Sequence, residues 1–373
     1  MARPLLAPIR ILTTMSILSV ISIFGQVSAR AAGDVSSLQV VQPAMTVAMN
    51  KVMSLANIDG NVWVTRFESS PNLISINPSN GSTNWSTYYS YNNLAMYDDG
   101  TNVWVAVNGS WYIYKVNRAD GTVIDSFEPC PNPNTIDGRG GILYIACTGS
   151  SPKFVMESSL NGYGYFFGGA VTSMSIAGHY LWMRLDSGLI KVIDIGSGSI
   201  PSDNSPYTSV SIGASSNTSY DSVMVGKDSV WTFNHDSGQL SQYSQDGVSR
   251  FQSLDYSGWS AAEKFASKES SYLWLTRSNG DLLQLDSATG KEIALYSTGS
   301  SNWFEKPVLV VGEQVWTSND SSLLEFPLAH PAGTPGAPTL VKAVVSGDSA
   351  LTWSWNPGLS GDSAITNYTW TGS

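Results

Sequence analysis

Residues 56–89 have the sequence ANIDGNVWVTRFESSPNLISINPSNGSTNWSTYY, and this stretch decides the fold. Asp59-Gly60 precedes a short apolar run around Trp63, and a second run, Leu73–Ile76, ends before Asn80-Gly81. Asp-Gly and Asn-Gly pairs accept the positive φ angles that tight hairpins require. The stretch therefore predicts short antiparallel strands joined by hairpins.

The same order of turns and strands recurs along the chain. An aromatic residue returns at intervals of 38 to 49 residues, as Trp63, Trp104, Tyr144, Trp182, Trp231, Trp274 and Trp316. Turn signals recur in step with it, and in the third repeat they are Asp137-Gly138 and Asn161-Gly162. Repeats of about 40–45 residues made of strands are typical of propeller blades. We therefore predict an all-β fold, a seven-bladed β-propeller whose aromatic residues pack between neighbouring sheets.

One strand is missing from the last repeat. The seventh repeat has strand-like runs at Val308–Val311, Val315–Trp316 and Leu323–Phe326 and then stops at Pro327. Ser36–Gln42 is an isolated strand-like run ahead of the first repeat. We predict N-terminal strand closure, in which Ser36–Gln42 completes the last blade and removes the open edges of the ring. The propeller is predicted to span residues 36–329.

The N-terminus has the features of a secretory signal peptide, predicted over residues 1–29. Arg3 and Arg10 precede the apolar run Ile11–Phe24, and small residues follow up to Ala29. Cleavage is predicted after Ala29, with Ala31 as the alternative. The apolar run is shorter than a membrane-spanning helix, so no membrane span is predicted. We expect a secreted or extracellular protein, and a place on the cell surface fits the same features.

Cysteine content and charge support this location. The chain has two cysteines, Cys130 and Cys147, and in an oxidising compartment we predict a disulfide between them. Two buried free thiols are the alternative. Charged residues are only 13% of the chain, and the formal net charge is −10. An acidic protein repels the phosphate backbone, so no nucleic-acid partner is predicted.

A second, shorter unit follows the repeats. Residues 330–337, HPAGTPGA, form a Pro/Gly linker. In residues 338–373, Pro338, Trp355 with Pro357, and Ile365–Tyr368 resemble the first three strands of a fibronectin type III domain. The resemblance implies a β-sandwich, which needs roughly 90–100 residues. We therefore expect a truncated fibronectin type III domain here.

The usual enzyme motifs are missing from the sequence. It has no GxSxG, HExxH, P-loop, CxxC or dinucleotide-binding motif. His235 beside Asp236 is a candidate for catalysis, and a solvated loop histidine is the competing interpretation. We therefore predict no catalytic residue, no cofactor and no metal ligand.

The repeat also resembles a known group of propellers. DGNVWVT (59–65) followed by LISINPSNG (73–81) is similar to the repeats of the streptogramin lyase, YVTN and NHL group, over Leu38–Leu328. The resemblance implies a seven-bladed ring. The lyase of this group depends on a His/Glu constellation with a divalent metal at the ring axis. The blades carry no histidine after His235, so this activity is not predicted.

The loops after the aromatic strands are the predicted ligand site. In known propellers these loops share one face of the ring, where Arg66, Arg184 and Arg277 would lie near the acids Glu68, Asp186 and Asp236. Arginines pair with carboxylates, and aromatic rings stack on sugars. The predicted ligand-binding residues are Arg66, Arg184, Arg277, Tyr91, Trp111, Trp259 and Trp303. The alternative is that each arginine pairs with its neighbouring acid and the aromatic residues pack locally.

Two classes of function follow from this pattern. The first is a secreted, monomeric propeller that acts as a binding or scaffolding module for an extracellular or cell-wall polysaccharide, or for an extracellular protein. The second is an extracellular polysaccharide hydrolase or lyase, with its active site in the propeller channel or in a domain beyond Ser373. Release of reducing sugar separates the two.

Overall fold

The computed structural model describes residues 30–31, 35–67, 69–89, 92–147, 153–157, 163–165, 171–196, 208–212, 222–261, 270–299, 307–331, 339–345 and 351–356. The predicted signal peptide, residues 1–29, lies outside these residues. Within the described ranges the regular structure consists of strands and one short 3-10 helix, η1 (Val35–Ser37). This confirms the predicted all-β class.

Six sheets are built from strands that follow one another in the chain, each strand antiparallel to its neighbours. The first two are β4 (Val52–Ile58), β5 (Asn61–Arg66), β6 (Leu73–Ile76), β7 (Thr83–Thr87), and β8 (Asn92–Asp98), β9 (Val103–Asn108), β10 (Ile113–Val116), β11 (Val123–Phe127). The third and fourth are β12 (Pro133–Arg139), β13 (Ile142–Cys147), β14 (Lys153–Glu157), β15 (Tyr163–Tyr165), and β16 (Val171–Ala177), β17 (Tyr180–Leu185), β18 (Leu189–Asp194), β19 (Thr208–Ser211). The fifth and sixth are β20 (Ser222–Val225), β21 (Val230–Asn234), β22 (Gln239–Tyr243), β23 (Arg250–Asp255), and β24 (Ser260–Ala261), β25 (Tyr272–Thr276), β26 (Asp281–Asp286), β27 (Glu292–Ser297).

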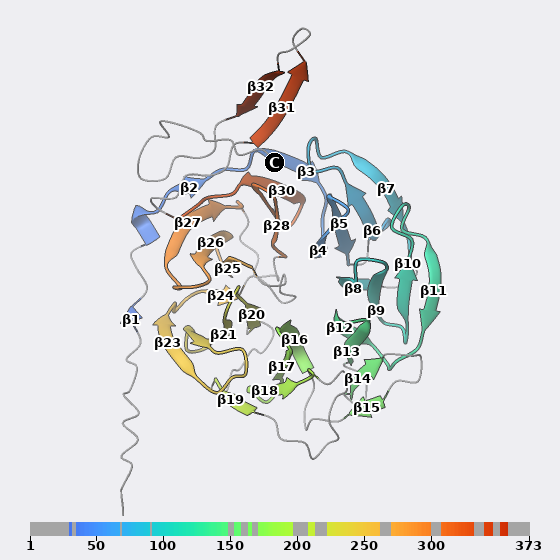
Figure 1. The fold of residues 1–373 in the computed structure, drawn as a ribbon, viewed down its shortest axis with the longest axis vertical. Helices are drawn as coiled ribbons and strands as arrows, with labels where there is room; N and C mark the ends of the chain where they lie inside the picture. Colours follow the sequence, from blue (N-terminus) through green and yellow to red (C-terminus); the bar gives the residue numbers. More distant parts are fainter. Residues whose placement is uncertain are drawn as a thin grey trace, which may run out of the picture.

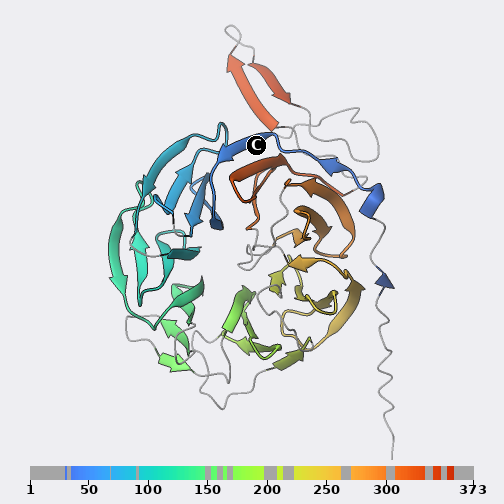
Figure 2. The same ribbon diagram turned by 180° about the vertical axis from the view of Figure 1, so that it is seen from behind.

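The sheets follow one another around a ring (Figures 1 and 2). The first strand of each sheet lies nearest the centre of the ring, and the fourth strand lies at the rim. This is the architecture of a β-propeller, as the repeats predict.

The repeated aromatic residues lie on the second strand of each sheet and form the core between sheets. Six of the seven are fully buried, and Trp104 is only partly buried. Trp63 packs edge-on against Trp85 of the same sheet, with ring centroids 4.5 Å apart. Trp104 packs edge-on against Phe127 at 6.0 Å and donates a hydrogen bond from Nε1 to Asp99 Oδ2 at 3.0 Å. The repeat of aromatic residues therefore marks the packing between blades.

A further sheet is assembled from both ends of the repeat array. It consists of β28 (Leu309–Val311), β29 (Gln314–Ser318), β30 (Ser322–Pro327) and β3 (Met45–Ala48). Strand β3 runs antiparallel to β30, and Met45 faces Glu325 in the register. The closure strand is therefore Met45–Ala48, and the prediction of Ser36–Gln42 is wrong. Met45 and Val47 pack against the apolar core between this sheet and the first one, whereas Val41 packs in the core between the sixth sheet and this one.

The predicted closure segment instead lies outside the sixth sheet. Strand β2 (Val40–Val41) pairs in parallel with β27, and the Leu295 amide donates to the Gln39 carbonyl at 3.0 Å. Val41 is buried in the core of that sheet. Further towards the N-terminus, β1 (Arg30–Ala31) pairs in parallel with β23. The N-terminal segment therefore runs along the rim of the fifth and sixth sheets before β3 joins the last sheet.

Among the hairpin turns that the structure describes, the predicted signals hold with one exception, and Asn161-Gly162 lies outside the described residues. In the first sheet Asp59 and Gly60 both have positive φ, 53° and 76°, as a two-residue hairpin requires. In the third sheet Asp137-Gly138 lies within β12, and the turn is Gly140-Gly141. Glycine is needed at position 138 because a Cβ there would lie 2.5 Å from the Tyr97 ring of the preceding sheet. That glycine signal therefore reflects packing between sheets, and the predicted turn is wrong.

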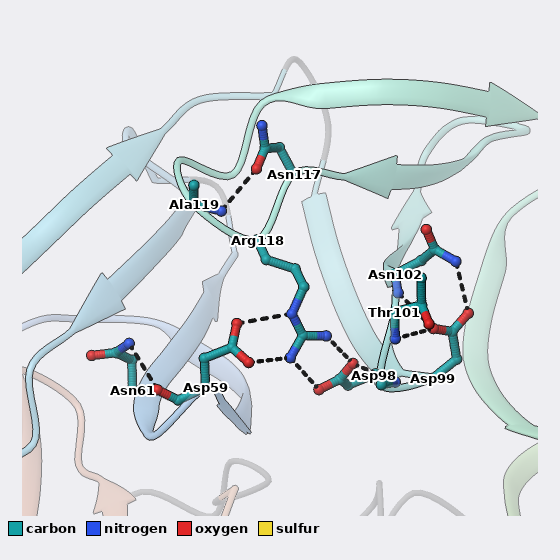
Figure 3. A network of polar contacts seen from close by, with 10 residues as sticks. Asp59, Asn61, Asp98, Asp99, Thr101, Asn102, Asn117, Arg118 and Ala119 are labelled. Carbon is teal, nitrogen blue, oxygen red and sulfur yellow. Dashed lines mark hydrogen bonds and ion pairs between the residues drawn. The ribbon is translucent and has the colours of Figure 1, made fainter.

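An arginine joins the first two sheets (Figure 3). Arg118, in the turn between β10 and β11, donates from Nε and Nη2 to Asp59 at 2.8 and 2.6 Å. Nη1 and Nη2 also donate to Asp98 at 2.5 and 3.2 Å. Hydrogen bonding from Arg118 lowers the pKa of the Asp59 carboxyl. Beside it, burial raises the pKa of Asp99, but hydrogen bonds from Trp104, Asn102 and Thr101 outweigh it and bring the value to about 2.

Cys130 and Cys147 form the predicted disulfide, with their Cα atoms 6.2 Å apart. Cys147 ends β13, and Cys130 lies in the connection that enters the same sheet. The bridge therefore ties a connection to the sheet that it precedes.

The last described strands, β31 (Thr339–Val345) and β32 (Leu351–Asn356), form a separate antiparallel hairpin. Ile365–Tyr368 lies outside the described residues. His330, the first residue of the predicted linker, contacts Glu313 of the last sheet through Nε2 and Oε2 at 2.6 Å.

Candidate functional site

Two kinds of loop meet on one face of the ring. One joins the second and third strands of a sheet, and the other connects the fourth strand to the next sheet. In the fifth sheet Asn234 Nδ2 donates to the carbonyl of Ile212, in the connection that enters the sheet, at 2.9 Å. In the last sheet Asn319 Nδ2 donates in the same way to the Thr298 carbonyl at 3.0 Å. We call the face formed by these loops and connections the loop face.

In the first sheet Arg66 makes the equivalent bond between a loop and the connection that enters the sheet. It lies three residues after the repeated tryptophan, as Asn234 and Asn319 do. Its Nε donates to the Asn50 carbonyl, in the entering connection, at 3.0 Å, and Nη1 donates to the Pro71 carbonyl at 3.0 Å. Burial lowers the pKa of this guanidinium. Arg66 therefore holds two loop-face segments together through backbone oxygens.

Arg277 occupies the equivalent position in the sixth sheet. Its guanidinium lies over the Trp259 ring, 5.0 Å from the ring centroid, and Trp259 belongs to the connection that enters the sheet. Nε also donates to Asp281 Oδ2 at 2.9 Å, and Arg277 and Asp281 form an ion pair. Trp259 is only 6% exposed, and it belongs to the apolar core between the fifth and sixth sheets. One third of the Arg277 side chain remains exposed.

Arg184 lies one residue earlier in its repeat, two residues after Trp182. Since successive side chains of a strand point to opposite faces, the shift places Arg184 on the Trp182 side of its sheet. Arg184 is fully buried, and Nη1 donates to the Leu185 carbonyl at 2.9 Å. The structure therefore does not bring Arg184 to the position that Arg66 and Arg277 share.

His235 binds the same connection as Arg277. Its Nδ1 lies 3.2 Å from the Trp259 carbonyl oxygen and 3.0 Å from Ser260 Oγ. Ser260 is buried, so this contact fixes the loop rather than presenting a hydroxyl to solvent. The pair therefore joins the fifth and sixth sheets at the loop face.

Aromatic side chains gather where the first two sheets meet. Tyr89 and Tyr114 have ring centroids 5.2 Å apart, and Tyr114 stacks on Tyr112 at 6.0 Å with an interplanar angle of 18°. The residues next to the two ends of this row, Tyr88 and Trp111, are 59% and 57% exposed. We call these five residues the aromatic cluster.

The predicted site residues differ in exposure, and some of them lie outside the described residues. Trp111 is exposed on the loop face, while Trp259 and Arg184 are buried. Tyr91, Trp303 and Glu68 lie outside the described residues. The sequence reasoning missed Tyr88. The pair Tyr88-Tyr89 follows strand β7, and strand alternation could have shown that one ring of this pair points out when the other points in.

Two searches for other kinds of site found nothing within the described ranges. No three His, Cys, Asp or Glu side chains there are placed to hold a metal ion. No helix in the described part of the chain is long and apolar enough to cross a membrane.

Comparison with known proteins supports the fold. No protein-family model and no curated protein matches the chain. The solved β-propeller domain of Cps50 (Swd1) from Myceliophteria thermophila is similar over 77% of this chain and 99% of that domain, with a TM-score of 0.56 and 8% sequence identity. BamB from Moraxella catarrhalis covers 74% of this chain and 83% of its own, with a TM-score of 0.49 and 14% identity. At such identity the Swd1 likeness shows the fold alone, and that fold is a β-propeller.

Proposed function

We propose that this chain is a secreted binding or scaffolding module, a propeller of seven blades that holds an extracellular polysaccharide on its loop face. Six blades are the sheets of consecutive strands, and the sheet assembled from both ends of the repeat array counts as the seventh blade. The disulfide Cys130–Cys147 fits an oxidising location outside the cytoplasm, as the predicted signal peptide does. The hairpin β31–β32 supports, as a further proposal, a fibronectin type III domain over residues 338–373.

One observation carries the proposal. The loop face is a fixed surface, since the connections and loops bond to each other in the first, fifth, sixth and last sheets. A surface that is ordered before binding loses little conformational entropy when a ligand arrives. On this surface Trp111 is largely exposed, and the Arg277 guanidinium is partly exposed above Trp259.

The test is affinity electrophoresis of the purified protein in native gels that contain a polysaccharide. We expect slower migration in at least one gel, and no release of reducing sugar from that polysaccharide. Unchanged migration in gels of neutral and anionic polysaccharides contradicts the proposal. Release of reducing sugar favours the hydrolase or lyase alternative.

A further inference from the structure

Among the described residues of the loop face, two aromatic rings are strongly exposed, those of Tyr88 and Trp111. Of the other large apolar side chains that are exposed in the described residues, Val40 lies on β2, Val123 and Ile124 on β11, and Val248 and Phe251 on β23 or its turn. All of these belong to the rim of the ring. The two rings on the loop face therefore differ in their place from the scattered apolar residues of the rim.

The backbone that presents Tyr88 is fixed by a buried amide. Asn72 Nδ2 donates to the Tyr89 carbonyl at 2.9 Å, and the Tyr89 amide donates to Asn72 Oδ1 at 2.8 Å. The Asn72 amide donates to the Thr87 carbonyl at 3.2 Å. Tyr88 is therefore held between two residues whose positions are set by the same asparagine.

The backbone that presents Trp111 is fixed in a similar way. Ser110 Oγ donates to the Val107 carbonyl at 2.8 Å and accepts from the Tyr112 amide at 3.1 Å. The Asn132 amide donates to the Ser110 carbonyl at 2.9 Å, and Asn132 Oδ1 accepts from the Gly109 amide at 3.2 Å. Both exposed rings therefore stand on ordered loops, and each is next in sequence to a residue at one end of the row Tyr89–Tyr114–Tyr112.

The described side chains that fix the two loops are polar and uncharged. The side chains that fix the two loops are Asn72, Ser110 and Asn132, which carry amides and a hydroxyl. Asp120 lies beside this junction, since its carbonyl accepts from Thr87 Oγ1 at 3.3 Å. Burial, Tyr114 and the charge of Asp120 together raise the pKa of Tyr89. A negative charge disfavours an anionic ligand, so the surroundings select a neutral one.

Neutral sugars fit this chemistry better than a protein partner does. The C–H face of a pyranose ring packs on an aromatic ring, while its hydroxyls bond to amides and hydroxyls nearby. A stable protein interface needs about 1,000 Å² or more of buried surface, far more than two exposed rings supply. The aromatic cluster is therefore suited to a polysaccharide chain.

We propose that Tyr88 and Trp111 form a stacking subsite for the pyranose rings of a neutral polysaccharide, at the junction of the first two sheets. This inference rests on the proposed function, because it names the ligand class and the residues of the loop face that bind it. Arg277 and Trp259 lie between the fifth and sixth sheets and take no part in this subsite.

The test is affinity electrophoresis with three neutral polysaccharides, hydroxyethylcellulose, xylan and galactomannan, and with the anionic polygalacturonate. Trp111→Ala and Tyr88→Ala should each weaken binding to a neutral polysaccharide about tenfold, since loss of about 1.4 kcal/mol of contact produces that change. Trp111→Phe should keep most of the binding, because an aromatic face remains. Both side chains are exposed, and circular dichroism checks that the variants fold.

Two control variants separate the outcomes. Phe251→Ala removes an exposed ring from the rim and should leave migration unchanged. Val248→Ala removes a second exposed apolar side chain from the rim and should also leave binding to neutral polysaccharides unchanged. If a gel slows the protein but Trp111→Ala and Tyr88→Ala migrate as the parent does, the subsite is wrong and the proposed function stands. Retardation by polygalacturonate alone likewise overturns the subsite. If none of the four gels slows the protein, both proposals fail.

Discussion

Arg118 joins the first two blades, and its replacement by glutamine tests whether ion pairs between blades stabilise the ring. The bond to Asp59 is largely exposed, with 58% of that side chain accessible, and such pairs contribute about 0.2–1 kcal/mol. The pair with Asp98 is more protected, with side-chain exposures of 22% and 23%. Hydrogen bonds to charged groups contribute about 1.5–3 kcal/mol. We therefore expect Arg118→Gln to lower the free energy of unfolding by about 2 kcal/mol, mostly through Asp98.

Urea unfolding of a double-mutant cycle measures the two contributions separately. The coupling of Arg118→Gln with Asp98→Asn should exceed its coupling with Asp59→Asn. The pKa of Asp59 is lowered in the folded protein, so its stabilising effect is present above its ordinary pKa of about 3.9 and is lost as the pH falls through the lowered value. The coupling with Asp59 should therefore shrink as the pH falls below the ordinary carboxyl pKa, and it should also shrink at high salt. An Arg118→Gln variant with the stability of the parent, or a larger coupling with Asp59 than with Asp98, refutes this reasoning.

Three further predictions concern the core and the closure of the ring. Trp63→Ala should lower the free energy of unfolding by about 3–5 kcal/mol, whereas Trp104→Ala should lower it less because the Trp104 ring is partly exposed. Equal losses of stability in thermal melts of the two variants contradict the core assignment. Burial raises the pKa of Glu325, so ionisation of its carboxyl destabilises the folded protein as the pH rises through the raised value. Glu325→Gln should therefore raise the melting temperature at about pH 7 but not at about pH 4. Deletion of residues 30–42 should leave a folded ring, since β3 remains, whereas deletion of residues 30–48 should remove closure and broaden the thermal transition; equal melts for the two deletions place closure elsewhere.

Much of the ring could be predicted because its signals repeat. The second strand of each sheet carries a large aromatic residue, and hairpin turns require residues that accept positive φ, as Asp59 and Gly60 do. Both constraints are local, so they are visible in a single sequence. Gly138 shows the limit of such reasoning. A glycine is required there because the Tyr97 ring of another sheet packs against the backbone, and not because the chain turns.

The closure strand and the site depended on features that a sequence pattern does not contain. Ser36–Gln42 and Met45–Ala48 are both short and apolar enough to pair with an open edge, and only packing against the first sheet chooses between them. Arg184 lies one position earlier in its repeat than Arg66 and Arg277 do. Adjacent residues of a strand point to opposite sides of the sheet, so this shift places the Arg184 side chain on the buried side. The exposed Tyr88 follows from the orientation of a loop that Asn72 fixes.

The sheet assembled from β28, β29, β30 and β3 sets an order on folding. Met45 of β3 pairs with Glu325 of β30, so β3 stays unpaired until the last strands of the ring have been synthesised. Six sheets can form from neighbouring segments as they emerge, but the seventh depends on a contact across almost the whole array. Contacts between distant segments form slowly, and the unpaired edge of β30 stays open to association with other chains until β3 arrives. Completion of the ring therefore depends on a strand supplied by the segment that follows the predicted signal peptide.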